Sequence, residues 1–194
     1  MIESCAVVRI YTDGSAYPNP GPGGYGTVLL SGGNRLELSG GFRRTTNNRM
    51  EIMAAVVGLE VLKDPSKVTV ISDSQYVVNA VEKGWARRWR ANGWRRNQDE
   101  AALNADLWLR LLSACERHIV KFVWVKGHAG NVENERCDRL AGQYRSAANL
   151  PVDEGFVEEQ PGAATKRSWV GGKPHRRFST LRFQETGEIA RETE

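Results

Sequence analysis

One apolar helix between two strand-like segments restricts the folds open to this chain more than any other feature. Residues 48–63 carry apolar side chains at the i, i+3, i+4 spacing of a helix, and further ones widen that stripe: Met50, Ile52, Met53, Ala54, Val56, Val57, Leu59 and Val61. The segment Asp64-Pro65-Ser66 ends it. Segments rich in strand-forming residues lie on either side, at 35–42 and 67–71. A helix between two strands permits a crossover, which lets strands of one sheet run parallel.

The remaining segments complete a βββαβααβα order. Residues 6–12, 25–30 and 35–42 have strand composition with turn residues between them, which predicts an antiparallel meander. Further strands are expected at 67–71 and 119–125, and helices at 73–82, 103–117 and 132–148. We therefore predict an α/β fold: a five-stranded mixed sheet, an antiparallel meander plus parallel strands, with helices on both faces. The strands at 6–12 and 67–71 should be parallel neighbours.

The glycines of 21–26 resemble a phosphate-cradling loop by composition. They do not lead into a helix, so we interpret them as part of a tight turn.

The character of the sequence changes after Asn149. Residues 161–180 are basic and contain no acid, whereas 181–194 carry four glutamates. We predict a catalytic domain at 1–149 and a C-terminal extension at 150–194. The extension is expected to be partly disordered, or docked on the domain through Trp169, Phe178 and Phe183.

The cysteines and the lack of long apolar runs favour a cytoplasmic protein without a membrane span. The three cysteines form no CxxC pair, which favours reduced thiols in a cytoplasmic protein without a zinc site. The first residues lack the basic leader and apolar run of a signal peptide. No run approaches 18 apolar residues, so no membrane span is expected.

Four acidic residues stand where a sheet of this order would gather them. Asp13 and Asp73 follow strands, and the carboxyl ends of strands in open α/β sheets bind ligands. Glu51 lies early in the apolar helix, and Asp138 in the last helix. Each has an ordinary alternative: Asp13 as a turn residue, Asp73 as a helix N-cap, Glu51 in a capping box with Asn48, and Asp138 on a solvated face. Spacing alone does not decide among them.

The segment 83–96 combines basic and aromatic residues. It contains six basic side chains, no acid, and three tryptophans, Trp85, Trp89 and Trp94. One interpretation is an amphipathic helix whose tryptophans pack inward. The other is a basic face that contacts nucleic acid, with aromatic rings beside it.

The sequence around these residues resembles a known family. The matching segments are Tyr-Thr-Asp13-Gly-Ser, Asn19-Pro-Gly-Pro-Gly-Gly-Tyr-Gly, Thr-Thr-Asn-Asn-Arg-Met-Glu51, Ser-Asp73-Ser-Gln-Tyr, Val-Lys-Gly-His128-Ala-Gly and Asn-Glu-Arg-Cys-Asp138. In order and spacing they resemble type 1 ribonuclease H, especially the bacterial form, ribonuclease HI. The resemblance covers roughly residues 6–148 and excludes the tail.

The resemblance implies an endonuclease that hydrolyses the RNA strand of RNA–DNA hybrids and leaves 3′-hydroxyl and 5′-phosphate ends. It implies that Asp13, Glu51, Asp73 and Asp138 hold two Mg²⁺ ions, with Mn²⁺ as an alternative. Carboxylate oxygens are the hard ligands that Mg²⁺ prefers. His128, in a loop between glycines, would transfer protons or help release the product. A monomer is expected.

The resemblance also implies the residues that contact the hybrid. Amide side chains can both donate to and accept from a 2′-hydroxyl, and Asn19, Asn47, Asn48 and Gln75 match positions near the RNA strand. Arg44, Thr46 and Asn104 match positions that hold a DNA phosphate. The basic segment resembles the protrusion that grips the DNA strand, with contacts expected from Trp85, Arg87, Arg88, Trp89 and Arg90.

Two other functions share parts of this pattern. A module that binds hybrids without cutting them would be indicated by a missing carboxylate, and none is missing. Transposases, integrases and junction resolvases use related folds, but the Thr-Thr-Asn-Asn-Arg-Met-Glu51 segment and the basic protrusion favour the ribonuclease.

Overall fold

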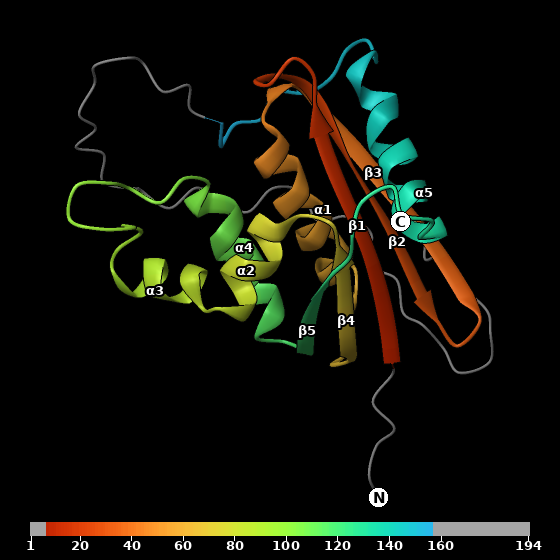
Figure 1. The fold of residues 1–194 in the computed structure, drawn as a ribbon, viewed down its shortest axis with the longest axis horizontal. Coiled ribbons are helices and arrows are strands. Elements are labelled where there is room, and N and C mark those ends of the chain that lie inside the picture. Colours follow the sequence, from red (N-terminus) through yellow and green to blue (C-terminus); the bar gives the residue numbers. More distant parts are fainter. Residues whose placement is uncertain (1–6, 157–194) are drawn as a thin grey trace, which may run out of the picture.

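A computed structural model describes residues 7–156 as a sheet with helices on both faces (Figure 1). The five strands are β1 (Val7–Ala16), β2 (Gly21–Ser31), β3 (Asn34–Thr45), β4 (Lys67–Ser72) and β5 (Ile119–Trp124). Their order is β3-β2-β1-β4-β5. The first three pair antiparallel, whereas β4 runs parallel to both β1 and β5. The predicted mixed sheet and its β1–β4 neighbours are confirmed.

The helices divide unequally between the two faces. They are α1 (Asn47–Glu60), α2 (Gln75–Glu82), α3 (Trp85–Ala91), α4 (Ala105–Cys115) and α5 (Val132–Gly142), followed by the short 3₁₀ helix η1 (Gln143–Arg145). The main core lies between the sheet and α1, with α2 and α4 joining it. On the other face α5 covers β1 and β2 over a smaller core of Val28, Cys137 and Leu140. Among residues 7–156 no helix is long and apolar enough to cross a membrane.

The sequence predictions for the first two strands were too short. Strand β1 continues past Asp13 to Ala16, so Asp13 lies within the strand and pairs with Gly26. The prediction of a tight turn at the glycines of 21–26 was wrong, because these glycines begin β2. The turn is confined to residues 17–20. Turn composition misled the prediction because these glycines serve close packing within a strand. The last helix also ends earlier than expected, at Gly142.

Two glycines beside Asp13 let helices approach the sheet very closely. A Cβ added to Gly14 would lie 2.3 Å from the backbone nitrogen of Glu51 in α1. On the other face, a Cβ on Gly26 would lie 2.2 Å from the carbonyl oxygen of Cys137 in α5. Such contacts are far inside van der Waals distance, so any larger residue would push the helix away.

A buried ionic cluster fixes the start of α1 to the segment that follows Asn149. The guanidinium of Arg49, only 2% exposed, donates from Nε to Asp153 Oδ2 at 2.7 Å and from Nη2 to Asp106 Oδ2 at 2.7 Å. Thr45 Oγ1 donates to the same Asp153 oxygen at 2.7 Å. The residues just after Asn149 therefore pack against α1 and α4. The predicted boundary at Asn149 stays a prediction, and Trp169, Phe178 and Phe183 lie outside the described residues.

Asp153→Asn should destabilise the protein strongly, because it removes the buried one of the two carboxylates that pair with the Arg49 guanidinium and leaves only the half-buried Asp106. We expect a loss of about 3 kcal/mol or more in the free energy of unfolding, measured by urea denaturation. Glu116→Gln, which breaks the exposed Arg90–Glu116 pair, is the control and should cost less than about 1 kcal/mol. Equal losses in the two variants would contradict the structural role of Asp153.

Gly26→Ala should displace α5 and with it Asp138. We expect a stability loss of about 1–3 kcal/mol from overpacking. If Asp138 takes part in the chemistry, the turnover rate should also fall, on the order of 10²-fold for a shift of about 1 Å. Gly33→Ala, at the tip of the β2–β3 hairpin with φ +86°, serves as the control, because it strains the backbone with nothing within 4 Å. A Gly26 variant with lowered stability and full turnover would disprove the positional effect.

Candidate active site

Four carboxylates from four elements gather around Asp13. Asp13 stands in β1, Glu51 near the start of α1, Asp73 directly after β4, and Asp138 in α5, and all four are half-buried. Burial, followed by the charges of Asp73, Asp138 and Glu51, raises the pKa of Asp13 to about 7. A group whose ionisation is opposed by three other acids lies at the centre of a cluster. The sequence predicted that Asp13 and Asp73 would lie close together, and in the structure Asp73, Asp138 and Glu51 all lie within electrostatic reach of Asp13.

The structure removes the ordinary alternatives for three of them. Asp13 lies in a paired strand and not in a turn. The N-cap of α2 is Ser74, which accepts from Val77 N, so Asp73 is not the cap. The N-cap of α1 is Thr46, which accepts from Arg49 N, so Glu51 does not complete a capping box. None of the three has a capping or turn role that would account for its position.

Glu51 is held towards the cluster by a hydroxyl group. Ser74 Oγ donates a short hydrogen bond to Glu51 Oε2. Burial nevertheless raises the pKa of Glu51 to about 7, with a further contribution from the charge of Asp73. The role of Ser74 was missed from the sequence, because only the fold brings the start of α2 against α1.

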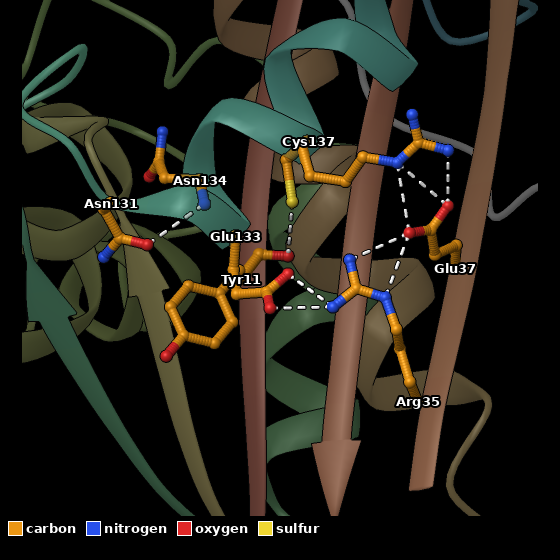
Figure 2. A network of polar contacts seen from close by, with 8 residues as sticks. Tyr11, Arg35, Glu37, Asn131, Glu133, Asn134 and Cys137 are labelled. Carbon is orange, nitrogen blue, oxygen red and sulfur yellow. Dashed lines mark hydrogen bonds and ion pairs between the residues drawn. The ribbon is translucent and has the colours of Figure 1, made fainter.

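The fourth acid lies on a helix fixed to the sheet by ion pairs (Figure 2). On β3, Arg35 pairs with Glu133 of α5 at 2.7 Å, and Glu37 pairs with Arg136 of α5 at 2.8 Å. Hydrogen bonds from Arg136, opposed by some desolvation, lower the pKa of Glu37 to about 2. The thiol of Cys137 donates to Tyr11 O of β1 at 3.2 Å. These contacts hold α5, and therefore Asp138, against β1 and β3.

The donor set suits a hard divalent cation. The acids offer carboxylate oxygens, which Mg²⁺ binds in preference to nitrogen or sulfur. Within residues 7–156, however, no three His, Cys, Asp or Glu side chains are already close enough to hold a metal. Burial, with smaller contributions from neighbouring acids, raises the pKa values of Asp13 and Glu51 to about 7 when no cation is bound. A cation would relieve the repulsion and draw the oxygens inward.

His128 occupies an exposed loop between β5 and α5. Its φ is +50°, a left-handed conformation, and Gly130 in the same loop has φ +83°. The loop runs from the end of β5, whose neighbour β4 ends just before Asp73, to the start of α5, which contains Asp138. The structure thus places His128 near this edge, without a described hydrogen bond to any of the four acids.

Of the predicted RNA-side amides, Asn19, Asn47 and Asn48 lie at the start of α1, and Gln75 begins α2. Asn47 Oδ1 accepts from Ala16 N at 2.6 Å, and Asn47 N donates to Asn19 Oδ1 at 3.2 Å, which joins the β1–β2 loop to the helix. Asn48, Arg44 and Gln75 are exposed. Thr46 caps α1, and Asn104 begins α4, where its Oδ1 accepts from Arg49 Nη1 at 3.4 Å. Asn47, Asn48 and Gln75 are thus close in sequence to Glu51 and Asp73, whereas Arg44 lies on β3 and Asn104 at the start of α4.

The basic segment combines tryptophans packed against the core with exposed arginines. Trp85, Trp89 and Trp94 are partly buried and pack against the core, and the Trp89 ring meets that of Trp108 edge-on at 5.9 Å. Arg87 and Arg88 are exposed, whereas Arg90 pairs with Glu116 at 2.7 Å. In Figure 1, α3 lies away from the sheet, beyond α2. The tryptophans thus anchor a helix that presents basic side chains outward.

The comparison with known proteins matches this arrangement. The family model for RNase H matches residues 6–146. A ribonuclease H of Desulforamulus reducens is 64% identical over 146 residues, which cover 75% of this chain and 92% of that protein.

Two solved structures share the fold. LC9-RNase H1, described as a type 1 RNase H with the type 2 active-site motif, has a TM-score of 0.65 at 26% identity, covering 81% of this chain and 79% of that one. LC11-RNase H1, solved in complex with an RNA/DNA hybrid, has a TM-score of 0.53 at 25% identity, covering 70% and 94%. With its sheet, its four gathered acids and these likenesses, the chain belongs to the ribonuclease H family.

Proposed function

We propose that this protein is an endonuclease that hydrolyses the RNA strand of RNA–DNA hybrids. The observation that carries the proposal is the gathering of Asp13, Glu51, Asp73 and Asp138 from four separate elements, with the pKa of Asp13 raised to about 7. Clustered acids destabilise a fold unless they hold cations. Family membership, and a relative solved with a hybrid, support the substrate.

We further propose that the four acids hold two Mg²⁺ ions, with Mn²⁺ as an alternative. When bound, the ions activate a water molecule as nucleophile and stabilise the leaving oxygen. Asp13, at the centre of the cluster, would contact both ions. Water attacks phosphorus and the bond to the ribose 3′-oxygen breaks. That oxygen takes up a proton, so the products carry 3′-hydroxyl and 5′-phosphate ends.

His128 and its loop complete the site in this proposal. The exposed imidazole would transfer a proton, or help the product phosphate leave, at the edge near Asp73 and Asp138. The glycines at 127 and 130 suit a loop that moves over a bound substrate.

The proposed hybrid contacts fall into one set for the RNA strand and one for the DNA strand. Asn19, Asn47, Asn48 and Gln75 would read the 2′-hydroxyls of the RNA strand, because an amide both donates and accepts. Arg44, Thr46 and Asn104 would hold a DNA phosphate. On α3, Arg87 and Arg88 would supply sequence-independent contacts to the DNA backbone beside Trp85, Trp89 and Arg90.

The protein is further proposed to act as a monomer in the cytoplasm. Cys115 and Cys137 are free and buried, and burial raises the pKa of Cys115 to about 11, which suits unreactive thiols under reducing conditions.

Cleavage of three end-labelled duplexes of one sequence tests the function. With Mg²⁺, only the RNA strand of the RNA–DNA hybrid should be cut, and EDTA should abolish cutting. Asp13→Asn should lower the turnover rate on the order of 10³-fold with the fold intact, because several kcal/mol of transition-state stabilisation depend on the metals. Asp64→Asn, in the turn after α1, is the matched control and should retain full activity. Tight hybrid binding without cutting by the wild-type protein would indicate a binding module instead.

The metal-free protein should lose stability as the pH rises through the range in which the cluster ionises. The pKa values of Asp13 and Glu51 rise from 3.8 and 4.5 to about 7 on folding. Their protonation therefore favours the folded state, fully below about pH 4 and progressively less up to about pH 7. In EDTA, the urea midpoint should fall more steeply between pH 5 and pH 8 for the wild type than for Asp13→Asn. Added Mg²⁺ should restore it at pH 8. Parallel pH curves for the two proteins would refute the repulsion.

A further inference from the structure

The carboxylate of Asp73 is enclosed on one side by two contacts, and a third contact fixes its backbone. Its Oδ2 accepts a hydrogen bond from Asn134 Nδ2 at 3.1 Å. A Cβ added to Gly127 would lie 2.6 Å from the same oxygen, so the backbone of the β5–α5 loop packs directly against it. Trp124 Nε1 donates to the Asp73 carbonyl at 2.9 Å and fixes the backbone. In the described part of the chain, no hydrogen bond reaches Oδ1.

Asn134 is itself held in place without help from Asp73. It is 3% exposed and lies in the first turn of α5, where its backbone nitrogen donates to the N-cap residue Asn131 at 3.2 Å (Figure 2). The same helix is tied to the sheet by the ion pairs with Arg35 and Glu37 and by the Cys137 thiol. Because α5 is fixed to the sheet, the Asn134 amide determines where the Asp73 oxygen that it contacts lies.

An amide is an unfavourable choice here for stability alone. Asn134 Oδ1 is buried and has no hydrogen-bond partner among residues 7–156. A buried unpaired oxygen costs stability, and an apolar side chain of equal shape would avoid that cost. An aspartate at this position would place another carboxylate against Asp73. The one group that only the amide supplies is the Nδ2 donor directed at Oδ2.

We propose that Asn134 is a positioning residue that assigns the two oxygens of Asp73. Its amide holds Oδ2 against Gly127 and leaves Oδ1 as the oxygen available to a divalent cation shared with Asp13. The inference rests on the proposed metal site and adds a determinant of metal affinity that is not itself a ligand. Without the amide, the carboxylate rotates freely and loses ordering entropy when the cation binds. Partners of metal ligands typically change affinity by about 10–100-fold when removed.

Asn134→Leu removes the donor with little change of shape. We expect about a tenfold weaker affinity for Mg²⁺ alone, measured by isothermal titration calorimetry on the hybrid-free protein. The Mg²⁺ concentration for half-maximal hybrid cleavage should rise by the same factor. Turnover at saturating Mg²⁺ and the KM for the hybrid should stay within about threefold, because the ligands themselves remain. Asn134→Ala should behave alike and replaces the leucine variant if that one does not fold.

Asn131→Ala is the matched control. It removes the N-cap of α5, three residues away, and leaves the amide of Asn134 present. A purely structural role for Asn134 predicts that both variants lower the melting temperature and that neither changes Mg²⁺ affinity. Unchanged Mg²⁺ affinity in Asn134→Leu would overturn the proposal. If the wild type bound Mg²⁺ but cut no hybrid, the proposed function would fail while the calorimetry still decided the role of Asn134.

Discussion

The close approach of two helices to β1 is the constraint on which the site depends. Gly14 and Gly26 leave no room for a side chain between the sheet and the backbones of α1 and α5. Asp13 lies between these two glycine contacts, next to Gly14 in the chain and opposite Gly26 in the ladder. The close packing brings Glu51 and Asp138 near enough to add to the effects of burial and of Asp73, which together raise the pKa of Asp13. Backbone packing therefore creates the electrostatic centre.

The cluster of acids around Asp13 lowers the stability of the metal-free fold. Burial and like charge raise the pKa values of Asp13 and Glu51 to about 7, so each resists ionisation in the metal-free protein. Charges of the same sign at a functional site are tolerated only when surrounding contacts determine the geometry. The surrounding contacts here are ionic and lie outside the cluster: Arg49 with Asp106 and Asp153 at the start of α1, and the β3–α5 pairs on the other face.

The two ionic groups differ in what they contribute. Arg49 and Asp153 are almost fully buried, so losing either partner exposes the other to a large desolvation cost. The β3–α5 pairs are partly exposed and screened by solvent, so their value lies more in orientation than in energy. Together they fix both helices that deliver carboxylates. The first turn of α5 also delivers Asn134, which couples the position of Asp73 to that of Asp138.

The sequence by itself predicted the mixed sheet with parallel neighbours at 6–12 and 67–71, and its motifs indicated the four acids and the family, because periodicity and short motifs are local properties of the chain. It did not determine the roles of Gly26, Ser74 or Asn134. Glycine-rich composition favours turns locally, whereas pairing with β1 and β3 makes residues 21–26 a strand. The close packing of α5, from more than a hundred residues away, leaves no room for a side chain at Gly26. Asn134 stands in a recognised motif, yet its partner Asp73 is 61 residues away in sequence. Contacts between distant elements exist only after the chain has folded, so tertiary structure alone decided which polar groups hold the acids in place.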